Sequence, residues 1–210
     1  MIMENVIKKI EELKYGEVGR LVNSRIKEFE EAGRKKEDAV FGELCFCLLT
    51  ANFSAEKCIH IQKEMGRGFS LLSEDELARE LRKHGHRFPN ARANYIYEAR
   101  KCEGDLCKLI GTGKERREKL VHDVKGLGMK EASHFLRNIG FKDVAIVDFH
   151  ILDLLKEEGL IEFDRRTQTL TKKRYLEIEG VLEGIAKRAG LNLAELDLYL
   201  WYIETGKVLK

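Results

Sequence analysis

The chain has 210 residues, of which 43% are hydrophobic, so it can bury a core and is not intrinsically disordered. Its length fits one domain or two small lobes that share a core. Lysine and arginine together number 38 and aspartate and glutamate 36, which gives a net charge of +2. This balance excludes a surface that is basic all over, so any basic patch must be local. No apolar run approaches the ~18–20 residues that a membrane span needs.

Helical periodicity runs through nearly the whole sequence and predicts an all-α fold with short connections. The expected helices lie near 3–14, 17–31, 36–50, 54–65, 74–83, 89–102, 104–111, 115–124, 130–139, 149–158, 172–189 and 193–204. Only the short stretch 143–149 alternates as a strand does. The five cysteines form no Cys-x-x-Cys pair, which favours a reducing, cytoplasmic environment.

The first candidate site follows the helix expected over 36–50. After an unbroken apolar run, Thr50, Asn52 and Ser54 bracket Phe53. Small polar residues with this spacing are typical of a helix end at which the next helix is capped. A side-chain amide such as that of Asn52 can hydrogen-bond the edge of a nucleobase, and Phe53 can act as a wedge or simply pack.

The stretch 82–101 combines basic and aromatic residues. It holds six arginine or lysine residues against one acidic residue, together with two histidines and three aromatic residues. Cations bind backbone phosphates, and exposed aromatic rings stack on bases or pry them apart. Arg87 and Phe88 lie on a predicted loop and form a candidate intercalating pair. The alternative is a charged helix face with Tyr95 and Ile96 in the core.

Two helical patterns within 116–140 flank the sequence KGLGM. Gly126 and Gly128 allow a tight turn and leave backbone N–H groups uncovered. Together with a helix N-terminus, such a turn suits a DNA phosphate. Lys130 begins the second helix away from its apolar face. There the helix dipole and partial burial favour the neutral amine that nucleophilic attack needs, although a solvated lysine is the alternative.

Asp148 precedes an apolar-periodic helix and is a candidate N-cap residue. Capping alone explains such a residue. A carboxylate held by backbone N–H groups also stays ionised, and it can stabilise positive charge on a sugar.

The last expected helix, near 193–204, carries the single tryptophan. Trp201 lies on the opposite side from the apolar face. A ring in that position is a candidate platform for a purine flipped out of the duplex, and the edge of the core is the alternative.

Taken together, the helix, G-L-G-M-K at 126–130, the helix that follows and V-D-F-H at 147–150 resemble the helix–hairpin–helix DNA glycosylase superfamily. The lysine two positions after the second hairpin glycine is similar to the branch that is also an AP lyase. With its short chain and C-terminal lysine, the sequence most resembles the second-type 8-oxoguanine DNA glycosylase/AP lyases of archaea and bacteria. The resemblance covers about 36–210 and departs from the superfamily at Lys125, where a proline is usual.

The resemblance implies a two-lobed fold, with one lobe over 32–139 and a second made of 1–31 and 140–210. It implies that double-stranded DNA containing 8-oxoguanine or an abasic site binds in the cleft between the lobes of a monomer, without a cofactor. No cysteine follows Cys107, so the four-cysteine iron–sulfur loop of related branches is absent, and no metal is expected.

The resemblance also implies a role for each candidate residue. Lys130 would attack C1′ of the damaged nucleotide and form a Schiff base, and β-elimination would then nick the strand 3′ to the lesion. Asp148 would stabilise the developing positive charge and help to position Lys130. The other implied contacts are Asn52 in the gap, Arg92 in its R-A-x-Y motif on the DNA, His150 on a phosphate, and Lys210 in the lesion pocket.

Two other interpretations remain open. One is the same chemistry on another oxidised base, such as a pyrimidine, against which Trp201 and Lys210 argue through the resemblance alone. The other is a non-catalytic helix–hairpin–helix module that binds DNA. Such a module would keep the two hairpin glycines but would not need Lys130 or Asp148.

Overall fold

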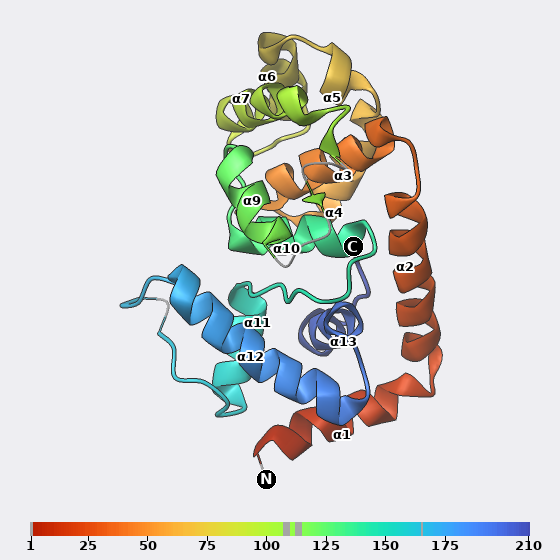
Figure 1. The fold of residues 1–210 in the computed structure, drawn as a ribbon, viewed down its shortest axis with the longest axis vertical. Coiled ribbons are helices and arrows are strands. Elements are labelled where there is room, and N and C mark those ends of the chain that lie inside the picture. The colour runs from red at the N-terminus through yellow and green to blue at the C-terminus, as the bar shows by residue number, and fades with distance from the viewer. Residues whose placement is uncertain (1, 107–109, 112–114, 165) are drawn as a thin grey trace. The chain divides into compact units, whose positions relative to one another are not determined.

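The computed structural model describes residues 2–106, 110–111, 115–164 and 166–210. The chain divides into two compact units, one made of Met1–Glu30 and Gly140–Lys210, the other of Glu31–Ile139. The described residues of both units form helices and no strand (Figure 1), which confirms the predicted all-α class. The helix expected over 104–111 includes 107–109, and these residues, Cys107 among them, lie outside the described part of the chain.

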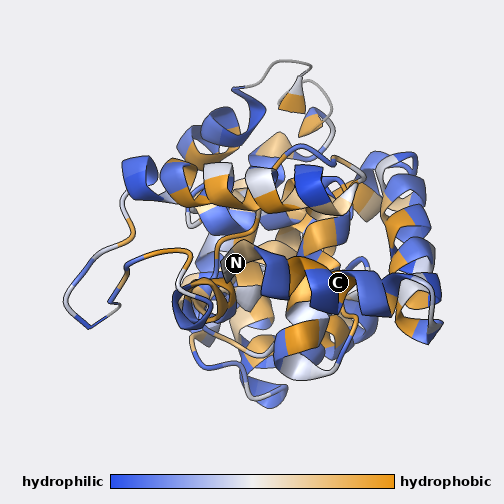
Figure 2. Cartoon of the chain, turned by 90° about the horizontal axis from the view of Figure 1, so that it is seen from below, coloured by the Kyte–Doolittle hydropathy of each residue, from blue (hydrophilic) through white to orange (hydrophobic). Residues whose placement is uncertain are grey.

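The discontinuous unit is built on helices from both ends of the sequence. α1 packs against α12 and α13, and α11 packs against α13. The helices are α1 (Ile2–Lys14), most of α2 (Glu17–Gly33), α11 (Phe149–Glu157), α12 (Lys172–Ala189) and α13 (Leu193–Thr205). Hydrophobic residues alternate with hydrophilic ones along most helices, as amphipathic periodicity requires (Figure 2).

The segment that alternates like a strand, 143–149, pairs with a helix instead. Its middle is buried, and side chains of α12 bind its backbone. The Ala145 amide donates to Glu179 Oε2 at 2.8 Å, and the Val147 amide donates to the Tyr175 hydroxyl oxygen at 3.1 Å. The Tyr175 hydroxyl in turn donates to the Ala145 carbonyl at 2.7 Å. These bonds satisfy the backbone without a neighbouring strand and fix the approach to α11.

The continuous unit is organised around α3, which packs against α4, α5, α7 and α10. Every residue from Leu44 to Thr50 is buried, so this helix is enclosed on all sides. The helices are α3 (Glu37–Thr50), α4 (Ala55–Met65), α5 (Gly68–Leu71), α6 (Glu74–Lys83), α7 (Pro89–Ala99), η1 (Arg100–Cys102), α9 (Arg116–Asp123) and α10 (Met129–Asn138). The single turn of α5 was not expected from the sequence.

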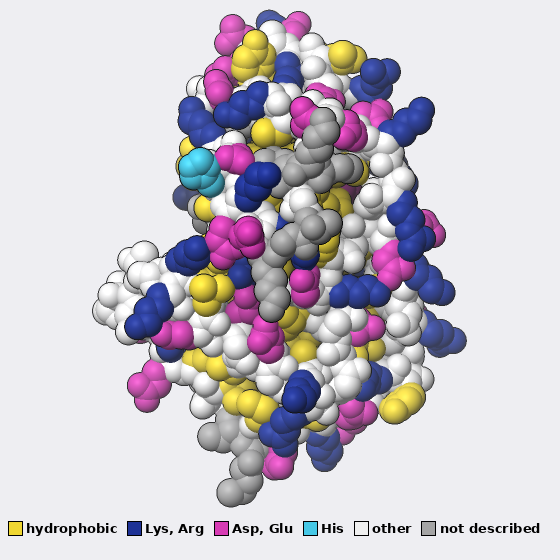
Figure 3. All heavy atoms as spheres, in the orientation of Figure 1, with side chains coloured by type: hydrophobic (Ala, Val, Ile, Leu, Met, Phe, Trp, Pro, Cys, Tyr) yellow, Lys and Arg dark blue, Asp and Glu magenta, His cyan; other side chains and the backbone are white. Residues whose placement is uncertain are grey.

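Charges of both signs are interspersed on the face drawn in Figure 3, as the near-neutral composition leads one to expect. Among the described residues, no helix combines the length and apolar character that crossing a membrane would require.

Candidate functional site

The hairpin expected at Gly126 and Gly128 is present between α9 and α10. Gly126 has a φ of +86°, in the region that favours glycine, and Gly128 is the N-cap residue of α10. Leu127 between them is buried, and its amide donates to the Val124 carbonyl at 3.2 Å. A Cβ added at Gly126 would lie 2.3 Å from Cδ2 of Tyr95, so the tyrosine ring closes directly onto the turn.

Lys130 lies in the first turn of α10, with its side chain only 25% exposed. Its Nζ lies 3.4 Å from Oε1 of Glu131, with which it forms an ion pair. Burial raises the pKa of the Cys58 thiol to about 12, and the charge of Lys130 acts against that shift. The amine is therefore partly enclosed and held in an ion pair, and its role as a nucleophile stays a prediction.

Asp148 caps α11 in the discontinuous unit. Its Oδ1 accepts a hydrogen bond from the Ile151 amide at 3.0 Å, which confirms the predicted N-cap. The side chain is half-buried, at the end of the segment that α12 holds in place. A carboxylate anchored in this way has a fixed position at the start of α11.

His150 and Trp201 lie edge to face in the same unit. Their ring centroids are 4.7 Å apart and the interplanar angle is 77°. His150 is exposed, whereas Trp201 and the C-terminal Lys210 are half-buried. The Trp201 Nε1 atom is buried and has no acceptor among the described residues. An indole that is partly open to solvent and in contact with the His150 ring suits a stacking platform.

Glu204, near the end of α13, is influenced by two further carboxylates. Burial raises the pKa of the Glu204 carboxyl, and the neighbouring carboxylates of Glu157 and Asp153 raise it further, while His150 acts in the opposite direction. The ionised form of Glu204 is therefore disfavoured in the folded protein.

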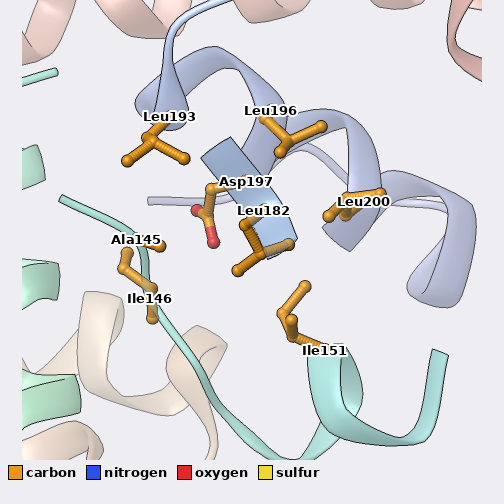
Figure 4. Close-up of a pocket in the computed structure, with 8 residues that line it drawn as sticks. All are labelled: Ala145, Ile146, Ile151, Leu182, Leu193, Leu196, Asp197 and Leu200. Carbon is orange, nitrogen blue, oxygen red and sulfur yellow. The ribbon is translucent and has the colours of Figure 1, made fainter. Parts of the chain in front are cut away.

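A small pocket is lined in part by Ala145 and Ile146, in the segment that leads to Asp148. Leucine and isoleucine side chains of α11, α12 and α13 line it, and the Asp197 carboxylate lies among them (Figure 4). It offers about 10 Å³, room for about one water molecule. It is therefore a packing gap, far too small for a nucleobase.

The turn after α3 presents Asn52. This residue is exposed and has a φ of +59°, a left-handed conformation that asparagine tolerates better than most residues. The Phe53 ring packs against the His86 ring, with centroids 4.2 Å apart. Of the two roles considered for Phe53, the structure favours packing.

The basic and aromatic candidates around α7 differ in exposure. Arg87 and Phe88 are exposed, with the guanidinium 5.2 Å from the centroid of the Phe88 ring. Arg92 is instead only 8% exposed, and its Nη2 donates to the Ala51 carbonyl at 2.8 Å. This burial argues against the direct DNA contact suggested by the R-A-x-Y motif, and it favours an internal role.

Sequence reasoning did not single out His86, which links the end of α3 to the loop before α7. Its Nε2 donates to the Leu49 carbonyl at 3.0 Å, and its Nδ1 accepts from the Phe88 amide at 3.1 Å. The only local signal is a histidine directly before the exposed Arg87–Phe88 pair, which periodicity does not distinguish from a surface residue.

The continuous unit thus holds Lys130, the hairpin, Asn52, Arg87 and Phe88, and the other unit holds Asp148, His150, Trp201 and Lys210. No cluster of three or more histidine, cysteine, aspartate or glutamate residues suited to a metal ion occurs in the described ranges.

Comparison with known proteins gives consistent matches over almost the whole chain. A family model described as 8-oxoguanine DNA glycosylase matches residues 22–191. The 8-oxoguanine DNA glycosylase/AP lyase of Korarchaeum cryptofilum is 50% identical over 213 residues, which cover 100% of both chains. The enzyme of the same name from Thermotoga maritima is 47% identical over 208 residues, which cover 98% of this chain and 99% of the relative.

Two solved structures of one archaeal protein are similar to this chain to the same degree. The crystal structure of the Methanocaldococcus jannaschii 8-oxoguanine DNA glycosylase has 50% sequence identity and a TM-score of 0.92, covering 99% of this chain and 97% of that one. A second structure of that protein, in complex with a 15mer DNA containing 8-oxoguanine, also has a TM-score of 0.92, with coverage of 97% and 99%.

Proposed function

We propose, because this chain belongs to the 8-oxoguanine DNA glycosylase family, that it excises 8-oxoguanine from double-stranded DNA and then cleaves the strand at the abasic site. Relatives named for both activities match the chain over 98–100% of its length. The observation that carries the proposal is the partly enclosed Lys130 amine at the start of α10, directly after a two-glycine hairpin.

The first chemical step uses Lys130 as the nucleophile. The amine gives up its proton and leaves the Glu131 carboxylate, and its lone pair then forms a bond to C1′ of the damaged nucleotide. The bond between C1′ and the base breaks, and the base leaves with the electron pair and takes up a proton. Opening of the sugar ring gives an imine between Lys130 and C1′.

Strand cleavage follows from the imine. Loss of a proton from C2′ and rupture of the bond between C3′ and its oxygen release the strand 3′ to the lesion, and water then hydrolyses the imine and frees Lys130. Asp148 stabilises the positive charge that develops on the sugar. Its bond to the Ile151 amide holds the carboxylate in place for this role.

The remaining candidates bind the DNA. The hairpin amides at Gly126 and Gly128 bind a phosphate, as does His150. A flipped base leaves a gap in the duplex, which Asn52 and the exposed Arg87–Phe88 pair fill. Trp201 and Lys210 bind the lesion. The protein acts on this substrate as a monomer in the cytoplasm.

The experiment uses one duplex containing 8-oxoguanine opposite cytosine and a second, undamaged duplex. Free base is measured by chromatography and the strand nick by denaturing electrophoresis. We expect release of 8-oxoguanine and a nick only in the damaged strand. Binding without release or nicking would instead support the non-catalytic module, and preferential release of an oxidised pyrimidine would support the other substrate class.

A further inference from the structure

The turn at Asn52 is held in place by two buried side chains outside α3. α3 ends at Thr50, so the carbonyl groups near its end need partners from elsewhere. The His86 Nε2 donates to the Leu49 carbonyl at 3.0 Å, and the Arg92 Nη2 donates to the Ala51 carbonyl at 2.8 Å. Asn52, which follows directly, has a φ of +59°. A non-glycine residue keeps this conformation when its surroundings fix it.

His86 also ties the exposed Arg87–Phe88 loop to this turn. Its Nδ1 accepts from the Phe88 amide at 3.1 Å, while its ring packs against Phe53. Because one ring nitrogen donates to a carbonyl and the other accepts from an amide, the hydrogen bonds require the neutral imidazole. Burial lowers the pKa of His86, which favours that same neutral form.

Arg92 links the turn to the hairpin as well. Its guanidinium lies 5.5 Å from the centroid of the Tyr95 ring, and that ring closes onto Gly126. A single buried side chain in α7 therefore contacts both the backbone beside Asn52 and the tyrosine under the hairpin.

We propose that Arg92 and His86 are positioning residues that set the Asn52 turn for gap filling and so support base excision without touching the DNA themselves. This inference rests on the proposed function. It assigns Arg92 an indirect role through the Ala51 carbonyl, which its burial and hydrogen bond support. A displacement of about 1 Å in a group that orients a substrate lowers the rate by up to about 100-fold.

The test variant is Arg92→Met, which keeps an unbranched apolar stem and removes the donor. The chain provides a closely matched control in Arg100. That arginine also donates to backbone carbonyls, with Nε bound to the Phe69 carbonyl at 2.8 Å, and it also lies over a tyrosine ring, 5.0 Å from the centroid of Tyr97. Arg100→Met therefore removes the same kind of anchor away from the Asn52 turn.

Single-turnover excision of 8-oxoguanine from duplex DNA is compared with nicking of a pre-formed abasic site in single-stranded DNA, where there is no opposite base. We expect Arg92→Met to slow excision by about 10- to 100-fold and to leave single-strand nicking within about twofold. Asn52→Ala should give the same pattern, and the double variant should be no slower than the slower single variant. Arg100→Met should excise at the wild-type rate.

Hydrogen–deuterium exchange of the free protein provides a readout that does not depend on activity. We expect faster exchange in peptide 48–56 for Arg92→Met and no change there for Arg100→Met. His86→Phe keeps a ring against Phe53 but removes both hydrogen bonds, so it should reproduce the Arg92→Met pattern, and it serves if Arg92→Met does not fold.

The positioning role would be overturned if Arg92→Met left excision unchanged, or if it slowed single-strand nicking as much as excision. It would also be overturned if the rate losses of Arg92→Met and Asn52→Ala multiplied in the double variant. Failure of the wild-type protein to release any base would refute the proposed function instead, and the exchange of peptide 48–56 would still decide whether Arg92 holds the turn.

Discussion

Replacing Gly126 with alanine should destabilise the protein by about 2–5 kcal/mol. Two separate costs add up at this position. A φ of +86° is unfavourable for a residue with a Cβ, at roughly 1–2 kcal/mol. The new Cβ would also lie 2.3 Å from Cδ2 of Tyr95, and relieving such overpacking costs roughly 1–3 kcal/mol. The substitution should also slow cleavage, because the hairpin amides lose their arrangement.

The assay is urea unfolding followed by far-UV circular dichroism. Gly128→Ala is the matched control, because its φ of −92° is allowed and its Cβ would meet only the flexible Glu131 carboxylate. The control should cost less than about 1 kcal/mol. In a Tyr95→Ala background, Gly126→Ala should keep only the backbone cost. A loss below about 1 kcal/mol in the wild-type background, or an equal loss with and without the tyrosine ring, would refute this reasoning.

Three further variants test separate parts of the site. Asp148→Asn removes the negative charge but keeps a good N-cap, so excision should fall by about 100-fold or more while the unfolding midpoint stays near wild type. Asp148→Ala should also lose about 1 kcal/mol of stability, and equal stability of the two variants would contradict the capping role. Removal of Lys210 should abolish 8-oxoguanine excision and retain abasic-site nicking in the gel assay; retention of both would refute its role in base recognition. Burial raises the pKa of Glu204, so its ionised form costs stability as pH rises. Glu204→Gln should therefore raise the unfolding temperature at pH 7 and lose that advantage well below pH 4.5; a constant difference would exclude this cause.

The elements that sequence analysis predicted well depend on local signals. Asp148 before an apolar-periodic helix is an N-cap, and two glycines between helical patterns form the hairpin at Gly126. Both features follow from residues within a few positions of each other, and backbone hydrogen bonding and steric rules apply at that range.

Features that depend on contacts between distant residues were not predictable in this way. The strand-like alternation of 143–149 gives no indication that Tyr175 and Glu179 will satisfy its backbone from another helix. Arg92 lies in a basic stretch that suggests contact with DNA, yet in the fold its guanidinium donates to the Ala51 carbonyl. Periodicity identifies which face of a helix is apolar, but it does not identify the partner that a buried polar side chain finds across the core.

The central claim is that one amine, that of Lys130, bonds covalently to the sugar. Incubation with 8-oxoguanine duplex and sodium borohydride, which reduces an imine to a stable amine, tests it directly. The account predicts a protein–DNA adduct whose modified peptide contains Lys130, absent in Lys130→Gln and present in the control Lys119→Gln, an exposed lysine of α9. An adduct that persists in Lys130→Gln, or that maps to another residue, would contradict it.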